Sequence, residues 1–234
     1  MLDHWLEKFD RRDAKQRLMR TGAKAAVGVV LRYNVALGTC FSEERDLLSQ
    51  WRGYANDGAG FSVTFDKEKL DRYCKDFDGG SRLLLSQVNY GNQDWEQVNT
   101  VVKTLHQAFG EDATKYQEGT DGFGSMSLSF TPEKNKLQKE AARDLFTVKN
   151  GAFKEEKEWR LFLFDSFNDI KGVEFRENAD LLSPFIRLKI PVGIIAGVTM
   201  GPTNPTPLSM IEAACKTNGV ECWVKTSNAS YRTR

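Results

Sequence analysis

The sequence predicts a single α+β domain with a mixed, largely antiparallel sheet and flanking helices. Its 234 residues fit one domain and allow a core large enough for independent stability. Its composition, 40% hydrophobic and 28% charged, is typical of globular rather than disordered chains. Helix and strand patterns mix along the chain without a strict β–α–β repeat, which favours the α+β class. We expect residues 1–39 to form an N-terminal helix and strand, followed by a core over residues 40–234.

The first quarter of the chain alternates between the two patterns. Apolar residues at helical spacing predict a helix over residues 2–20, and a partly β-branched apolar run predicts one or two strands over residues 27–41. A second helical stripe covers residues 44–56. The Asp57–Gly58–Ala59–Gly60 stretch then predicts a sharp turn, because glycine adopts left-handed conformations. Alternating apolar and polar residues at 61–65 predict a half-buried strand.

The middle of the chain begins with a helix capping signal. Asp66 can cap a helix that we expect to end near residue 77. A strand follows over residues 83–90. Asn92 can cap a further helix, which Gly110 ends. A polar, glycine-rich stretch over residues 111–124 predicts a long loop.

Prolines mark the two helices expected in the second half. Thr131–Pro132 places proline at the first helical position, and Thr206–Pro207 begins a final helix. The helices that they begin are expected to run to about Val148 and to Gly219. The remaining apolar runs predict strands, over residues 159–164, 185–190, 194–200 and 220–225.

Charge and cysteine content exclude several classes of function. Lys and Arg total 33 against 32 for Asp and Glu, so the net charge of +1 lacks the basic excess of a nucleic-acid binder. The four cysteines form no CxxC pair and only two histidines are present, which argues against a zinc site. The charged start lacks the apolar run of a signal peptide, and the longest apolar stretch, residues 191–198, is too short to span a bilayer. We therefore expect a cytoplasmic protein without membrane association.

The first candidate cluster lies where the predicted strand gives way to a helix. Ser42 stands at this junction, where a hydroxyl is typical of a helix N-cap. Trp51 and Tyr54 are three residues apart and so share a helix face, which favours packing in the core. Beside a pocket, the same two aromatic residues could instead stack on a planar ligand ring.

The second candidate cluster is a charged strand. In an extended chain Glu156, Glu158 and Arg160 project to one side, while Trp159 and Leu161 project to the other, toward the core. Two carboxylates at alternate positions repel one another unless a cation separates them, and Arg160 could be that cation. The arrangement suits a site that holds a cationic or sugar-like group. It is also typical of a solvated, charge-paired strand edge.

The two clusters and a polar C-terminal segment, Ser227 to Arg232, follow one another in an order that resembles a known family. The matching features are CFS at 40–42, WRGYA at 51–55, the glycines at 58 and 60, Lys149 with Phe153 and EKEWR at 156–160, Gly201, and the closing Ser227 and Tyr231-Arg232. Together they resemble the bacterial domain-of-unknown-function family 2971, the DUF2971 family, over roughly residues 40–234.

Members of that family are similar, distantly, to ADP-ribosyltransferases. In those enzymes a glutamate of an (E/Q)xE element binds the nicotinamide ribose of NAD. The resemblance implies that Glu158 is the catalytic carboxylate and Glu156 the other carboxylate of the element. It also implies a split-sheet core of the ADP-ribosyltransferase type and NAD as the cofactor.

The resemblance further implies the residues that would hold the cofactor. Ser42 corresponds to the serine of the upstream strand, and Trp51 or Tyr54 to the aromatic residue that frames nicotinamide. Arg160 is a further candidate for NAD binding. ADP-ribosyltransferases also carry an Arg or His on the first core strand; Arg32 is the nearest candidate here, although it lies in no recognisable motif.

Three hypotheses of function follow from these patterns. The leading one is an NAD-dependent ADP-ribosyltransferase-like toxin or phage-defence effector that modifies a macromolecular target. The second is a non-catalytic module that binds a small ligand or a protein through the same cleft. The third is a metal-dependent hydrolase or nuclease in which Glu156, Glu158 and Asp165 bind a divalent cation.

Overall fold

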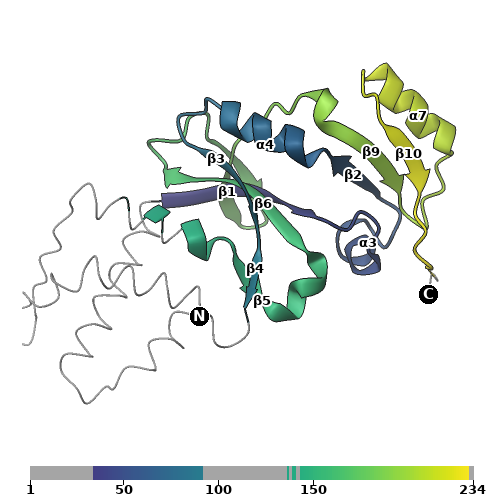
Figure 1. Cartoon of the computed structure of the whole chain (residues 1–234), viewed down its shortest axis with the longest axis horizontal. Helices are drawn as coiled ribbons and strands as arrows, with labels where there is room; N and C mark the ends of the chain where they lie inside the picture. The colour runs from purple at the N-terminus through teal and green to yellow at the C-terminus, as the bar shows by residue number, and fades with distance from the viewer. Residues whose placement is uncertain (1–33, 92–135, 137–138, 141–142, 232–234) are drawn as a thin grey trace, which may run out of the picture. The chain divides into compact units, whose positions relative to one another are not determined.

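A computed structural model describes residues 34–91, 136, 139–140 and 143–231 (Figure 1). The helices predicted over residues 2–20 and 92–110, the loop over 111–124, most of the helix over 131–148, and Arg32 and Arg232 lie outside the described residues. The chain divides into two compact units, each built from separate stretches of sequence. Unit 1 comprises Met1–Leu37, Val88–Ala152 and Leu163–Lys171, and unit 2 comprises Gly38–Gln87, Phe153–Phe162 and Gly172–Arg234. The single domain expected from the sequence stays a prediction.

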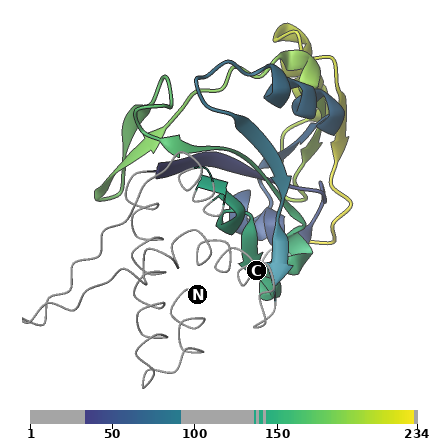
Figure 2. The same cartoon turned by 60° about the vertical axis from the view of Figure 1, so that its left-hand side comes forward.

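One three-stranded sheet has the order β1-β6-β3, and Figures 1 and 2 show β1 and β6 running along one another. The strands are β1 (Asn34–Ser42), β6 (Glu158–Ser166) and β3 (Leu83–Gln87). The central strand β6 carries three of the most buried side chains of the described residues, Leu161, Phe162 and Leu163, each at most 1% exposed. Such complete burial on consecutive positions means that both faces of β6 are covered at its middle.

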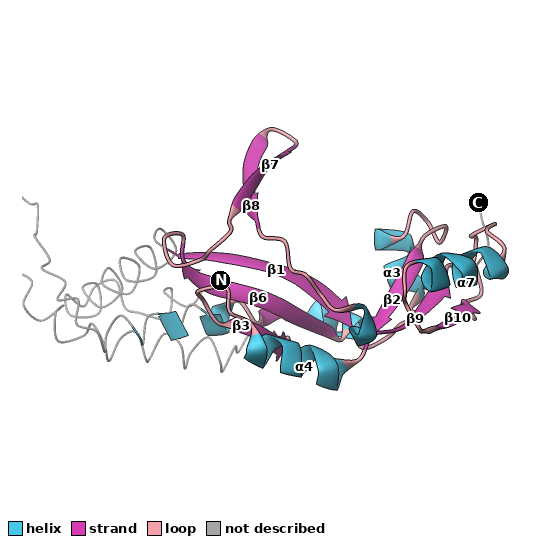
Figure 3. Cartoon of the chain, turned by 90° about the horizontal axis from the view of Figure 1, so that it is seen from above, coloured by secondary structure: helices cyan, strands magenta, loops and turns pink. Residues whose placement is uncertain are grey.

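A second three-stranded sheet lies wholly in unit 2, in the order β10-β9-β2. Strand β2 (Phe61–Phe65) pairs antiparallel with β9 (Ile195–Met200), and β10 (Trp223–Thr226) pairs with β9 in parallel. Figure 3 shows helix α7 (Leu208–Thr217) beside β10. The strands predicted at 61–65 and 194–200 are therefore confirmed, because alternation and apolar runs are strong local signals.

A two-stranded ribbon, β7 (Glu174–Asn178) and β8 (Leu181–Phe185), forms an antiparallel hairpin that is visible in Figure 3. The strand predicted over 185–190 is wrong, because β8 ends at its first residue. Pro184 lies inside β8, where proline is tolerated because each strand of a two-stranded ribbon has a free edge. The charged β7 was not predicted, since all five of its residues are exposed and show no alternation.

In unit 1, β4 (Asn89–Gly91) pairs in parallel with β5 (Val148–Asn150). The strand predicted over 83–90 is thus two strands, which are separated at the buried Val88. The side chain of Lys139 forms an ion pair with Asp165, and its Nζ lies 3.6 Å from Asp169.

The start of helix α4 follows its local capping signal. Asp66 accepts a hydrogen bond from the Lys69 amide at 3.0 Å, so the predicted cap of α4 (Lys67–Asp76) is confirmed. Helix α3 (Leu48–Tyr54) is shorter than the stripe predicted at 44–56. Two short 3-10 helices, η1 (Gly151–Glu156) and η2 (Val192–Ile194), complete the elements.

The α+β class with mixed sheets is confirmed, since the described pairings include both antiparallel and parallel strands alongside helices. The split-sheet core of the ADP-ribosyltransferase type stays a prediction.

Candidate functional site

Strands β1 and β6 bring the predicted site residues together. The Glu43 amide donates to the Lys157 carbonyl at 3.1 Å, and a Cβ on Gly38 would lie 2.6 Å from that of Phe162. From the first contact to the second, the residue number falls from 43 to 38 on β1 and rises from 157 to 162 on β6. The two strands are therefore antiparallel, and Cys40 lies opposite Arg160. We call Cys40, Ser42, Glu156, Lys157, Glu158 and Arg160 the β1–β6 cluster; all six residues belong to unit 2.

The centre of the cluster is a buried ion pair. The Nε of Arg160 donates to Oε1 of Glu158 at 2.7 Å, and the Glu158 and Arg160 side chains are 5% and 20% exposed. Burial alone would lower the pKa of Arg160, but the hydrogen bond and the charge of Glu158 outweigh it, so this pKa is raised. The interpretation of this segment as a solvated strand edge is wrong, because β6 is the central strand and Glu158 is buried.

Ser42 links β1 to the end of η1 rather than starting a helix. Its hydroxyl donates to the Glu156 carbonyl at 2.7 Å and accepts from the Glu44 amide at 3.1 Å. The predicted N-cap is therefore wrong: α3 begins at Leu48, and Leu47 occupies the N-cap position. The residues between Ser42 and Leu47 form an irregular turn, within which a serine hydroxyl can satisfy nearby backbone groups.

Lys157 changes the direction of the chain between the two glutamates. Its φ of 42° is left-handed, a conformation that costs a non-glycine residue about 1–2 kcal/mol. Glu156 consequently ends η1 while Glu158 begins β6. The prediction that both glutamates share one face of an extended strand is wrong for this reason. The exposed Lys157 ammonium pairs with the Glu44 carboxylate, which raises the pKa of Lys157.

The opposite face of β6 carries a second set of polar contacts. The Trp159 indole donates to Glu43 Oε1 at 2.7 Å, and the Gln87 amide reaches the same oxygen at 3.2 Å. The Lys67 ammonium lies 4.6 Å from the centre of the Trp159 ring, within cation–π range. Leu161 is fully buried as predicted, whereas Trp159 is only half-buried.

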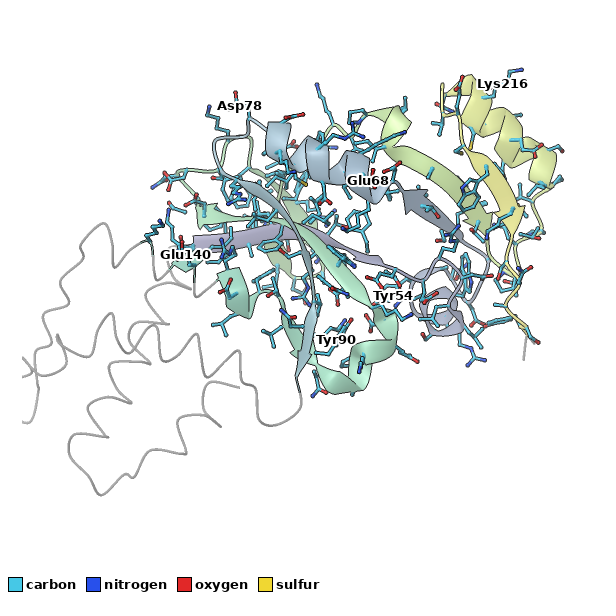
Figure 4. All side chains as sticks on the ribbon, viewed as in Figure 1. Tyr54, Glu68, Asp78, Tyr90, Glu140 and Lys216 are labelled. Carbon is cyan, nitrogen blue, oxygen red and sulfur yellow. The ribbon has the colours of Figure 1, made fainter. Side chains whose placement is uncertain are left out.

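The two aromatic candidates of α3 occupy different environments. Trp51 is 3% exposed and its indole donates to Asp46 Oδ1 at 2.7 Å, so its predicted core packing is confirmed. Tyr54, labelled in Figure 4, is 77% exposed. The prediction that they share one helix face in the core is therefore wrong for Tyr54. Tyr54 is the last residue of α3, one turn beyond Trp51, and the end of the helix from Arg52 onward is exposed.

Asp46 anchors the C-terminal segment, a contact that was not predicted. Its carboxylate accepts from the Ser227 hydroxyl and, at 2.7 Å, from the Asn228 amide. Burial alone would raise the pKa of Asp46, but these bonds and the one from Trp51 lower it below its ordinary value. The serine was visible in the sequence as part of a terminal cluster, but its partner lies 181 residues away.

The C-terminal segment makes a second contact with the α3 region. The Tyr231 hydroxyl contacts the Asp57 carboxylate, and the Arg52 guanidinium lies 5.6 Å from the centre of the tyrosine ring. Two parts of the family-like pattern, the WRGYA segment and the terminal Ser227 and Tyr231, are thereby adjacent in unit 2.

Close backbone contact explains the glycines of the pattern. The Gly201 amide donates to the Gly60 carbonyl at 3.0 Å, and a Cβ on Gly201 would lie 2.0 Å from the Gly58 oxygen. Gly58 itself has a φ of 87°, so the predicted turn is confirmed. These glycines bring the turn after α3 against the end of β9.

The described residues offer little for other kinds of site. Among them, no group of three or more His, Cys, Asp or Glu side chains could hold a metal ion, so the hydrolase hypothesis gains no support. A pocket of about 390 Å³ is lined by seven residues between Cys74 and Arg82, among them Phe77 and Ser81, and by no member of the β1–β6 cluster. No helix of the described part of the chain is long and apolar enough to cross a membrane.

Comparison with known proteins identifies one family. Residues 50–161 match the model of a family described as "Protein of unknown function (DUF2971)". The match begins in α3, ends inside β6 and contains Glu156, Glu158 and Arg160. The predicted resemblance to this family is confirmed over residues 50–161, whereas its extent over residues 40–234 and the similarity to ADP-ribosyltransferases stay predictions. Neither the curated proteins nor the solved structures include a significant match.

Proposed function

We propose that this chain, whose residues 50–161 match the DUF2971 family model, binds NAD at the β1–β6 cluster and acts as an ADP-ribosyltransferase-like enzyme. The observation that carries the proposal is the Glu158–Arg160 pair at the start of the central strand, with Ser42 on the adjacent strand. A carboxylate held in a partly water-excluded site by a guanidinium is a strong acceptor for a sugar hydroxyl.

The residue types of the cluster suit the chemical groups of NAD. A ribose hydroxyl can donate to Glu158, and the serine of β1 can bond a carboxamide or hydroxyl. Arg160 presents a planar fork of N–H donors, the geometry that recognises phosphate oxygens, and is the more exposed member of its pair. Tyr54 supplies an exposed aromatic face, whereas Trp51 is already packed in the core.

NAD bound there would supply an ADP-ribosyl group with nicotinamide as the leaving group. The contribution of the protein is electrostatic: the Glu158 carboxylate stabilises positive charge that develops on the ribose, and Arg160 orients that carboxylate through their hydrogen bond. Ser42, held by the Glu156 carbonyl, fixes the turn before Glu158. The acceptor would be a macromolecule, and the biological role that of a toxin or phage-defence effector.

One observation favours a second candidate, a non-catalytic module that binds a ligand through the same cluster. The Glu158 side chain is 5% exposed and already engaged with Arg160. A buried carboxylate that is already paired can hold the Arg160 guanidinium in place, but a ligand reaches the carboxylate only if the surrounding side chains move. In that case Arg160 would make the ligand contact and Glu158 would position it.

The two functions are separated by calorimetric titration with NAD and a parallel assay of nicotinamide release. The variants are Glu158→Gln and, as a matched control, Glu212→Gln at an exposed position of α7. If the protein is an ADP-ribosyltransferase-like enzyme, the wild-type protein should bind NAD and release nicotinamide. Glu158→Gln should weaken binding about tenfold, the effect of about 1.4 kcal/mol, and lower release by about a hundredfold.

Each remaining outcome has a definite meaning. Binding without nicotinamide release in the wild-type protein supports the non-catalytic module. Absence of binding at millimolar NAD excludes both functions for this ligand. If Glu158→Gln and Glu212→Gln weaken NAD binding and nicotinamide release equally, the proposed role of the cluster is wrong.

A further inference from the structure

Two cysteines of unit 2 lie next to each other at the end of α7. Cys215 is in the last turn of the helix, beside the Lys216 labelled in Figure 4, and Cys222 comes directly before β10. Their sulfur atoms are 3.8 Å apart, and both residues are half-buried. Sulfurs at this separation need only a small side-chain rotation to reach the bonding distance of about 2.05 Å.

The backbone between the cysteines holds them together. The Val220 amide donates to the Cys215 carbonyl at 2.9 Å, and the Gly219 amide donates to the Lys216 carbonyl at 3.1 Å. Gly219 has a φ of 68°, which glycine adopts without strain and which reverses the chain after the helix. The proximity of the two thiols is therefore a consequence of a well-bonded turn and not of side-chain placement alone.

We infer that Cys215 and Cys222 form a reversible dithiol–disulfide pair, a modification site for small-molecule disulfides such as glutathione disulfide. One thiolate of the pair attacks a sulfur of glutathione disulfide, forms a mixed disulfide and releases one glutathione thiolate. The second cysteine loses its proton and attacks the protein sulfur, which expels the other glutathione. The two protein thiols are oxidised, and one glutathione disulfide is reduced to two glutathione molecules.

The other two cysteines provide internal comparisons. Cys40 is exposed on β1 and can react with glutathione disulfide. Its reaction should stop at the mixed disulfide, which makes it the comparison for the paired cysteines. Cys74 is buried, and burial raises its pKa to about 11, so it should not react in the folded protein. The pKa of Cys222 is also raised, by burial and by its contact with Cys215, so we expect disulfide formation to accelerate with rising pH.

The bond would connect the end of α7 to the start of β10. Strand β10 runs parallel to β9 and leads directly to Ser227 and Asn228, which bind Asp46. A cross-link at its start restricts the unfolded chain, so the oxidised protein should unfold at a higher temperature than the reduced one.

The test equilibrates the folded protein with mixtures of reduced glutathione and glutathione disulfide, followed by alkylation and peptide mass spectrometry. We expect a linked peptide pair containing Cys215 and Cys222, the loss of two hydrogen atoms from the intact mass of that pair, and full reversal by excess reduced glutathione. In Cys215→Ser, Cys222 should stop at the mixed disulfide with glutathione, as Cys40 does.

Two results would overturn the inference. One is the recovery of Cys215 and Cys222 as separate glutathione adducts in the wild-type protein at every glutathione ratio. The other is a Cys215–Cys222 link that appears only after the protein has been unfolded, detected by repeating the equilibration in denaturant. Circular dichroism of Cys215→Ser and Cys222→Ser confirms that both variants are folded before they are compared.

Discussion

Removal of the Arg160 guanidinium should destabilise the protein far more than loss of a surface charge. Arg160→Met keeps most of the side-chain length but takes away the group that lies 2.7 Å from the buried Glu158 carboxylate. Breaking a buried ion pair from one side typically costs about 3–5 kcal/mol. Because the Arg160 side chain retains 20% exposure, we expect a loss near the lower end, about 3 kcal/mol.

A double-mutant cycle isolates the interaction between the two side chains. Glu158→Gln leaves a guanidinium that can turn toward solvent, so its cost should be smaller, about 1–2 kcal/mol. The two variants combined should cost less than the sum of their separate effects, with a coupling energy of about 1–2 kcal/mol. The assay is urea unfolding followed by circular dichroism, with the free energy of unfolding taken from the midpoint and slope.

Acidity gives an independent check on the same reasoning. In Arg160→Met the buried carboxylate favours its protonated form, so the folded state holds a proton that the unfolded state has already released. The unfolded state releases this proton at the ordinary glutamate pKa of about 4.3. The free energy of unfolding of the variant should therefore fall, relative to wild type, as the pH rises above that value. A loss below about 1 kcal/mol in Arg160→Met, with additive effects in the double variant, would refute the account of a buried pair.

Three further perturbations test the surroundings of the site. Asp46→Asn should cost about 1–2 kcal/mol in urea unfolding, because three donors lose a charged acceptor. Since the pKa of Asp46 is lowered from 3.8, its contribution is present above that value, is lost as the pH falls, and is absent from the variant. Gly201→Ala should cost at least about 2 kcal/mol in thermal unfolding, as its Cβ would meet a carbonyl oxygen at 2.0 Å; Gly193→Ala, with no neighbour within 4 Å, is the neutral control. Alkylation of Cys74, with a pKa raised to about 11, should be much slower than that of exposed Cys40 at pH 8; equal rates would contradict its burial.

Features that depend on neighbouring residues in the chain were predicted well. The Asp66 cap involves an amide three residues away, and the alternation at 61–65 is a property of five consecutive residues. The turn at Gly58 follows from the conformational freedom of glycine. In each case the free energy that selects the structure is local, so the sequence pattern contains it.

Features that depend on distant contacts or on a single unusual backbone angle were not predicted. The left-handed φ of Lys157 breaks the strand alternation that would have placed Glu156 and Glu158 on one face. The burial of Glu158 follows from the central position of β6, and strand order is a property of the whole sheet. The bond between Asp46 and Ser227 joins residues 181 positions apart.

The central claim is that NAD binds at the β1–β6 cluster, and hydrogen exchange measured with and without NAD tests it most directly. At saturating NAD, peptides covering residues 38–44 and 155–162 should exchange more slowly, and at an NAD concentration near the wild-type Kd most of that protection should be lost in Glu158→Gln. Unchanged exchange in both peptides despite bound NAD, or protection confined to the pocket at residues 74–82, would contradict the claim.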